Sequence, residues 1–465
     1  MYNEVRNTCG GEGSMKKSEI SQFDRMTQTP VAKLVVRLSV PTIISMLVTN
    51  IYNLVDTAFV GRLGTSASGA VGVVFGFMAI IQAVGFMFGQ GSGSLIAREL
   101  GRKDVKDASA TASTGFFCAM GVGLISALVC FWRLDPLIML LGSTETIAPF
   151  AKAYISWILL AAPFMTSSFV LNNILRYEGK ASLGMIGLLT GAVLNMAGDP
   201  LFMFVFHMGI AGAGLSTALS QIVSFLILLS MFLRGKTSTR LSLRAVSLKA
   251  ALLGDIVATG LPSLLRQGLN SLTTILLNDC AGVYGDEAIA AMSIVSRIGF
   301  FVFSVALGVG QGFQPVSGFN YGAGKYDRVR KAFWFTFALA EGLMAVAAVA
   351  VFLASNDLIG LFRDDAAVIE IGTRALRLHC GALLFLPLCM VTEMLYQSTG
   401  HKLGAALLSS MRSGIIFIPA LLLLARFRGL AGIQEAQPLA YVLAFLPALW
   451  LVLRFFRKLP GRSTI

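Results

Sequence analysis

Two aspartates, Asp56 in YNLVDTAFVGRLG and Asp199 in NMAGDPLF, lie inside long apolar stretches of the sequence. An ionised carboxylate is costly in such surroundings. If these stretches cross a membrane, each Asp at mid-depth costs about 2.5–3.5 kcal/mol on insertion scales. Ionisable residues inside membrane segments usually serve a function, so these two are the first candidates for a functional site.

Polar residues accompany both aspartates at helical spacing. One face of the first apolar stretch carries, at intervals of four, three and four residues, Ser45, Thr49, Tyr52 and Asp56. Asn195 lies one helical turn before Asp199, and Thr217 in GAGLSTALSQ adds a hydroxyl group from the next stretch. Hard oxygen atoms of this kind suit Na⁺ or H⁺ and do not suit a soft transition metal. We therefore predict a cation site formed by Asp56, Asp199, Asn195 and Thr217.

The composition indicates a protein that folds in lipid. Of its 465 residues, 55% are hydrophobic and 13% are charged, whereas soluble domains average about 25% charged residues. The net charge of +13 comes from basic residues in short loops between apolar stretches, so we expect no nucleic-acid partner. The six Cys and three His are scattered without catalytic or metal-ligand spacing. We therefore predict no disulfide, no cofactor and no enzyme activity.

Apolar stretches separated by polar segments predict an all-α integral membrane protein with about twelve transmembrane helices. The predicted spans are 33–60, 67–96, 110–132, 147–175, 182–205, 210–233, 252–281, 288–316, 330–354, 368–398, 403–425 and 433–455. Basic residues gather in alternate loops, among them Arg102, Lys103, Arg176, Lys180, Arg240 and Arg328. The positive-inside rule then places both termini in the cytoplasm. We expect a multi-pass protein of the inner (plasma) membrane that acts in the lipid bilayer as a monomer.

The second half of the chain repeats the first. A shift of about 221 residues superimposes Pro41 on Pro262, Gly61 on Gly282, Gly89-Gln90-Gly91 on Gly310-Gln311-Gly312, and Gly179 on Gly400. This repeat predicts two pseudo-symmetric six-helix lobes, at residues 31–233 and 251–458. A polar tail at 1–30, in which Met15 is an alternative start, precedes them, and a basic linker at 234–250 joins them. Secondary transporters commonly show such parallel repeats.

The two lobes differ where the candidate site lies. Asp56 corresponds to Leu277 of the second lobe, and Asp199 corresponds to Ala420. The carboxylates therefore belong to the N-terminal lobe alone. Both lobes need packing, so this asymmetry favours a chemical task over a structural one.

With these residues in view, the chain resembles the multidrug and toxic compound extrusion (MATE) transporters. The resemblance extends from about residue 30 to 455. It rests on five segments in this order: YNLVDTAFVGRLG, ARELGRKD, LNNILRYEGK, NMAGDPLF and GFNYGAGKYDRVRKA. The last segment most resembles the bacterial drug-exporter branch.

The resemblance implies two six-helix bundles in a V-shaped arrangement that export cationic small molecules against entry of H⁺ or Na⁺. In members with an N-lobe cation site, the matching positions here are Asp56, Asn195, Asp199 and Thr217, which would be the metal ligands if Na⁺ binds. We expect substrate contacts from Tyr52, Asn53, Asn172, Asn173 and Glu393. Another branch has a Glu eight residues after the proline of its GLP motif, where this chain has Asn270, and this difference argues against a C-lobe carboxylate site of that design.

The alternative function is a flippase for a lipid-linked precursor, from the same broad superfamily. Such proteins hold phosphates in strongly cationic central cavities, whereas the distinctive buried charges here are acidic and favour a cationic cargo. A primary pump would need a Walker-type phosphate loop, and the sequence has none.

Overall fold

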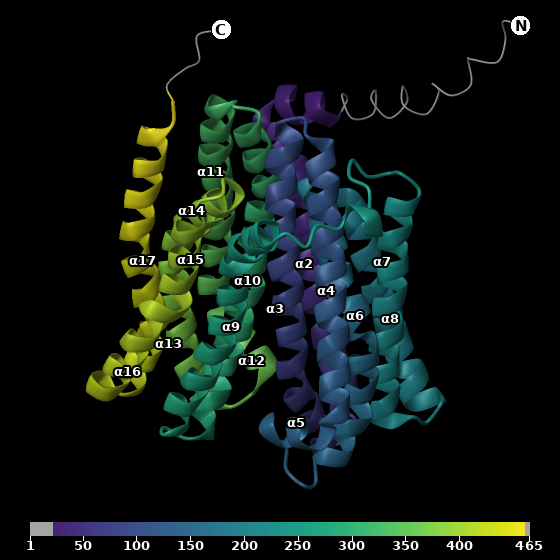
Figure 1. Cartoon of the computed structure of the whole chain (residues 1–465). Coiled ribbons are helices and arrows are strands. Elements are labelled where there is room, and N and C mark those ends of the chain that lie inside the picture. Colours follow the sequence, from purple (N-terminus) through teal and green to yellow (C-terminus); the bar gives the residue numbers. More distant parts are fainter. Residues whose placement is uncertain (1–21, 461–465) are drawn as a thin grey trace, which may run out of the picture.

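The computed structural model describes residues 22–460, and within this range the chain forms helices and short turns with no strand. The N-terminal lobe contains α2 (Val31–Gly61), α3 (Thr65–Gly101), α4 (Val105–Trp132), α5 (Leu134–Leu140), α6 (Ala148–Tyr177), α7 (Ala181–Pro200) with the π-turn η1 (Leu201–Val205), and α8 (Gly209–Leu233). Figure 1 shows α6, α7 and α8 on one side of the molecule, with α2 and α3 near its middle.

The C-terminal lobe follows a short 3₁₀ turn, η2 (Leu243–Ala245). Its elements are α9 (Ala250–Gly282), α10 (Asp286–Gly322), α11 (Tyr326–Leu353), α12 (Ser355–Phe362), α13 (Ala366–Ala382), η3 (Leu383–Phe385), α14 (Leu386–Ser398), α15 (Lys402–Ser410), η4 (Met411–Ile415), α16 (Phe417–Arg428) and α17 (Leu430–Lys458). Two predicted spans, 368–398 and 403–425, are therefore interrupted helices. Pro387 at the start of α14 lacks the N–H that would continue the preceding helix, which explains the first break.

Eleven segments of the described chain are long and apolar enough to cross a membrane. The predicted all-α membrane fold is confirmed. The predicted number of twelve spans stays a prediction. The remaining long helix, α9, has 33 residues but is less apolar, with Arg266, Gln267 and Asn270 in its middle.

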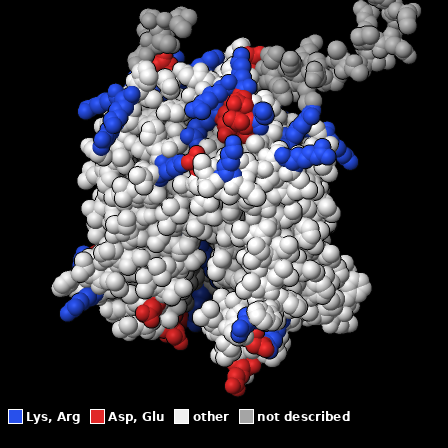
Figure 2. Space-filling view, in the orientation of Figure 1, with Lys and Arg blue, Asp and Glu red and all other residues white. Residues whose placement is uncertain are grey.

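The lobes pack tightly at one end of the molecule. We call this the basic end, because Lys and Arg gather there in Figure 2. It carries the α3–α4, α6–α7 and α10–α11 loops. An added Cβ would meet a backbone carbonyl oxygen of the other lobe at four glycines: Gly91 against Ile256, Gly101 against Phe319, Gly260 against Met87, and Gly322 against Arg98. Glycine thus allows backbone to touch backbone between the lobes. At the opposite, far end the two lobes part, and Figure 2 shows a hollow between them.

Helix α2 contacts both lobes. Ser39 Oγ, in the half of α2 nearer the basic end, donates to the carbonyl oxygen of Val309 in α10 at 3.2 Å, and Asn50 Nδ2, in the far half, donates to Ser304 Oγ of the same helix at 2.7 Å. Helix α2 also packs against α7 of its own lobe. Pro41 lies inside the helix and cannot donate the backbone hydrogen bond of an ordinary residue.

Part of the segment predicted as a polar tail is folded against the lobes. Residues 22–28 form a helix, and Met26 is fully buried. Phe23 lies against Phe319 with ring centroids 5.8 Å apart, so apolar side chains dock this segment on the C-terminal lobe. Arg25 Nη2 donates to the carbonyl oxygen of Gly179 in the N-terminal lobe at 2.9 Å. The segment therefore touches both lobes at the basic end. Residues 1–21 lie outside the described range.

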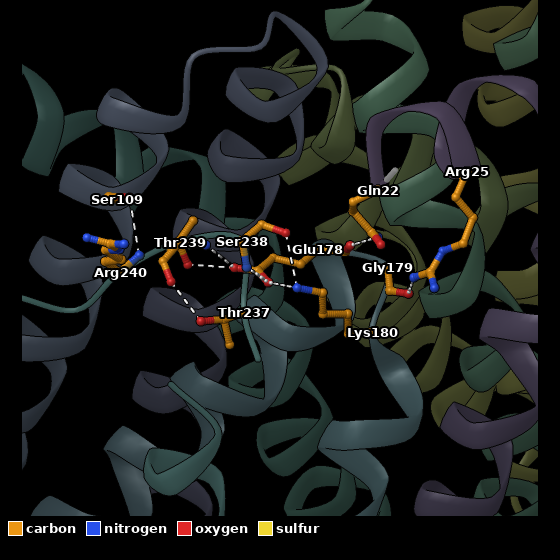
Figure 3. A network of polar contacts seen from close by, with 10 residues as sticks. All are labelled: Gln22, Arg25, Ser109, Glu178, Gly179, Lys180, Thr237, Ser238, Thr239 and Arg240. Carbon is orange, nitrogen blue, oxygen red and sulfur yellow. Dashed lines mark hydrogen bonds and ion pairs between the residues drawn. The ribbon is translucent and has the colours of Figure 1, made fainter. Parts of the chain in front are cut away.

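The linker after α8 folds back onto the N-terminal lobe, as Figure 3 shows. Gly235 ends α8 with a φ of 65°. The buried Glu178 carboxylate then accepts hydrogen bonds from the Ser238 N–H at 2.7 Å, the Thr239 N–H at 2.9 Å and the Thr239 hydroxyl at 2.6 Å. Charge-assisted bonds to backbone N–H groups hold this segment in place.

We predict that Gly260→Ala destabilises the protein, because the added methyl group would collide with the Met87 carbonyl oxygen at the lobe contact. Overpacking of this kind costs about 1–3 kcal/mol. The matched control is Gly268→Ala on the same helix, where an added Cβ meets no atom within 4 Å. Thermal unfolding of the purified variants measures the difference. Equal unfolding temperatures would contradict close packing of the lobes at this glycine.

Candidate functional site

The predicted cation-site residues lie together in the N-terminal lobe, where α2, α7 and α8 meet. Asp199 is fully buried, Asn195 and Thr217 are buried, and Asp56 on α2 is half-buried. Small residues let α7 and α8 approach closely. An added Cβ at Gly198 would touch the Ser216 side chain. This close approach brings the polar groups of α7 and α8 within hydrogen-bond distance.

The Asn195 amide organises the pocket. Its Nδ2 donates to Asp199 Oδ1 and to Thr217 Oγ1, both at 3.2 Å. The Ser216 hydroxyl donates to the backbone carbonyl oxygen of Asn195, also at 3.2 Å. One amide thus links the carboxylate of α7 to the hydroxyl of α8.

The carboxyl groups of Asp56 and Asp199 lie close enough to interact electrostatically. Ionised carboxylates only accept hydrogen bonds, so two of them in contact need a proton or a cation between them. Three buried side-chain oxygens of the pocket have no hydrogen-bond donor: Asp56 Oδ1, Asn195 Oδ1 and Asp199 Oδ2. The pocket therefore has an excess of acceptors, which fits H⁺ or Na⁺.

Two tyrosines border this pocket. Tyr52, one turn before Asp56 on α2, lies close enough to both aspartates to feel their charge. Tyr154 of α6 is almost fully buried and lies close enough to Asp56 and Thr217 to interact with both. Sequence analysis missed both Tyr154 and Ser216. Tyr154 has no spacing relation to the aspartates, and Ser216 had only its position beside Thr217 as a signal.

The other predicted substrate residues do not join the aspartates. Asn53 is half-buried on α2. Asn173 is fully buried; its Nδ2 donates to the Phe169 carbonyl oxygen at 2.7 Å, and its side-chain oxygen accepts from Arg176. Asn172 lines a small cavity beside Arg176.

Glu393 lies in the C-terminal lobe and forms an ion pair with Arg266 at 2.7 Å, with both side chains buried. The predicted substrate residues thus fall in separate places, and their role stays a prediction.

A buried polar layer connects the lobes, and sequence analysis missed it. Arg176 was assigned to a basic loop, but it lies in the last turn of α6, is buried, and donates to Gln311 of the other lobe. Gln90 of α3, the counterpart of Gln311, accepts a hydrogen bond from Ser263 of α9 at 2.9 Å. The repeat aligns Gln90 with Gln311, and this pairing of buried amides was the signal available in the sequence.

Comparison with known proteins identifies the family. The MatE family matches residues 41–201 and 262–423, once in each lobe. The chain belongs to the MatE family. The two matches start at Pro41 and Pro262, the positions that the internal repeat superimposes.

Curated relatives cover nearly the whole chain. Multidrug export protein MepA of Staphylococcus saprophyticus is 29% identical over 439 residues, which is 94% of this chain and 96% of the relative. The protein of the same name from Staphylococcus aureus strain N315 is 28% identical over the same shares.

Solved structures agree with this assignment. A MATE in complex with MaL6 has a TM-score of 0.88 at 26% identity and covers 93% of this chain and 98% of its own. An outward-facing multidrug resistance MATE family transporter of the MOP superfamily has a TM-score of 0.87 at 26% identity, over the same shares. The predicted membership of the bacterial MATE transporters is confirmed.

We predict that cations stabilise the wild-type protein and do not stabilise Asp56→Asn. The folded pocket offers unpartnered oxygens to a cation and the unfolded chain does not, so binding raises the unfolding temperature. Thermal unfolding would be followed with Na⁺ replacing choline at constant alkaline pH, and separately with falling pH at zero Na⁺. Asp135→Asn, an exposed Asp in the same lobe, is the matched control and should respond like wild type. An unchanged response in Asp56→Asn would contradict cation binding at this pocket.

Proposed function

We propose that this protein is a secondary active transporter that exports organic cations and drugs in exchange for H⁺ or Na⁺. The family and the names of its curated relatives support export of small molecules. The observation that supports the exchange is the Asp56–Asp199 pair, in which Asp56 Oδ1 and Asp199 Oδ2 are buried without a donor. The acidic character of this pocket favours a cationic cargo over the phosphate of a lipid-linked precursor.

The exchange follows because the coupling ion and the cationic substrate compete for the same negative charge. A cation or proton at Asp56 and Asp199 neutralises the pair, so the pocket loses its attraction for a cationic substrate. With the coupling ion absent, the acidic pair favours the substrate. Entry of one positive charge down a membrane potential provides about 2.3 kcal/mol per 100 mV, which can drive a substrate outward against its gradient.

Helix α2 is the element best placed to transmit this change. Its far half carries Asp56 beside Asp199 of α7, and it is bonded to α10 at Ser39, before Pro41, and at Asn50, after Pro41. Neutralising the pair changes the electrostatic interaction between α2 and α7, and we propose that α2 then bends near Pro41, where its backbone hydrogen bonding is already interrupted. A bend there would alter the relative position of the two lobes.

The orientation of the protein in the membrane is part of the proposal. The positive-inside rule places the basic end, and with it both termini, in the cytoplasm. The lobes are closed at that end and parted at the far end, so the described conformation opens outward. The cation site forms within one lobe of one chain, which supports a monomer as the transport unit in the plasma membrane.

The decisive experiment is ethidium flux in proteoliposomes under an imposed Na⁺ gradient or an imposed pH gradient. We predict that wild type moves ethidium against one of these gradients, and that the effective gradient names the coupling ion. Asp56→Asn should lose at least about 90% of the gradient-driven flux, because removing an interaction with the coupling charge commonly costs an order of magnitude or more.

Asp135→Asn, with the same chemical change at an exposed position of the same lobe, should keep wild-type flux. Unimpaired flux in Asp56→Asn would reduce this carboxylate to a packing group. Absence of ethidium flux in wild type, together with movement of a lipid-linked precursor, would overturn the drug-export proposal in favour of the flippase.

A further inference from the structure

A cavity of about 330 Å³ opens at the basic end of the C-terminal lobe, far from the Asp56–Asp199 pocket along the chain. Aromatic and basic side chains of α10, α11, α14 and α17 form its wall, with Tyr321, Tyr326, Tyr396, Phe455, Arg454 and Lys458 among them. His401, between α14 and α15, completes it. None of the functions proposed above uses this cavity.

The corresponding place in the N-terminal lobe is filled by the chain itself. The internal repeat places Tyr396 on Leu175, His401 on Lys180, and Lys458 on Thr237. Around Leu175–Lys180, the segment Thr237–Thr239 lies on the lobe and is bound by the Glu178 carboxylate, as Figure 3 shows. One lobe thus closes this site with its own backbone, whereas in the other lobe the described residues, which end at Pro460, leave it open.

Two sequence differences explain the open site. At the end of α8, Gly235 adopts a φ of 65° and turns the chain back over the lobe. The matching residue of α17 is Phe456, and α17 continues as a helix to Lys458. Glu178, which holds the returning segment, is the C-cap of α6, and its counterpart at the C-cap of α14 is Thr399. The C-terminal lobe lacks both the turn and the carboxylate.

The open site is electropositive. Arg454 and Lys458 are one helical turn apart on α17, and no acidic residue is among the described residues that line the cavity. Partial burial, together with the positive charges of Arg98 and Lys458, lowers the pKa of His401 below its usual value. A neutral His401 can form hydrogen bonds with a bound ligand but adds no charge of its own to the cavity. The chemistry of the cavity suits an anion.

The surroundings also suit a ligand with an apolar part. Trp450 lies one turn before Arg454 on α17, more than half exposed, and its ring contacts the Arg454 guanidinium at 5.0 Å. Tryptophan commonly lies at the membrane interface. Trp450, Arg454 and Lys458 follow one face of α17 from the apolar surface into the cavity. A free phosphate ester would use the basic residues alone, whereas a phospholipid would use the whole face.

We propose that this cavity binds the phosphate headgroup of an anionic phospholipid from the leaflet at the basic end. The inference rests on the membrane placement proposed above, and it does not depend on the transported substrate or on the coupling ion. Basic pockets between transmembrane helices on the cytoplasmic side are suited to anionic headgroups.

Native mass spectrometry of the purified full chain tests the proposal, with phosphatidylglycerol and phosphatidylcholine of identical acyl chains as probes. Wild type should retain phosphatidylglycerol and prefer it over phosphatidylcholine. The double variant Arg454→Gln/Lys458→Gln should bind phosphatidylglycerol at least about tenfold more weakly, because each basic residue near an anionic lipid contributes about fivefold in affinity.

The charge-matched control is Arg457→Gln/Lys249→Gln, which removes two exposed cations at the basic end that do not line the cavity. It should bind phosphatidylglycerol like wild type. Thermal unfolding without lipid shows whether each variant is folded. Glycerol 1-phosphate separates the two sources of phosphate: failure to compete supports a lipid, and full competition at equal concentration would overturn the lipid in favour of a soluble ester. Equal binding of both lipids, or equal loss in both double variants, would also overturn the proposal.

Discussion

The cost of two carboxylates in contact inside a membrane protein is the constraint on which the rest of this structure depends. Asp56 and Asp199 cannot both stay ionised at low cost without a cation or proton between them. Asn195 and Thr217 supply only part of the hydrogen bonding, since oxygens of Asp56, Asp199 and Asn195 remain without donors. A site that is incomplete in this way can exist in two charge states. Two charge states of one pocket are what an exchanger needs in order to hold either an ion or a cationic substrate.

A charge change acts on transport only if the fold converts it into movement. Here the rigid parts are the two lobes, joined at the basic end by backbone contacts at Gly91, Gly260 and Gly322. Close packing of this kind resists gradual deformation and favours a small number of discrete arrangements. Helix α2 belongs to both parts, because it carries Asp56 of the pocket and binds α10 of the other lobe through Ser39 and Asn50. The helix therefore connects the charge state of the pocket with the relative position of the lobes.

The sequence predicted which polar residues gather in the N-terminal lobe and less of their surroundings. Helical spacing and the mismatch between repeats identified Asp56, Asp199, Asn195 and Thr217, because those signals lie within single helices and in the alignment of the lobes. Tyr154 and Ser216 depend on which helix faces they meet, and that information comes only from packing. Arg176 was misplaced for a similar reason. Its charge indicated a loop, but Asn173 and Gln311 accept its hydrogen bonds inside the protein, and such partners make burial of a cation tolerable.

The duplicated lobes differ most where charge is placed. The N-terminal lobe keeps its unsatisfied carboxylates in the far half and closes its basic end with the Glu178-bound linker. The C-terminal lobe neutralises its buried Glu393 with Arg266 and leaves its basic end open beside Arg454 and Lys458. If packing were the only requirement, both lobes would be expected to keep the same arrangement of charged residues, since their helices and glycines match. The differences fit the separate tasks proposed above, with a cation site in the N-terminal lobe and a site for anionic lipid in the C-terminal lobe.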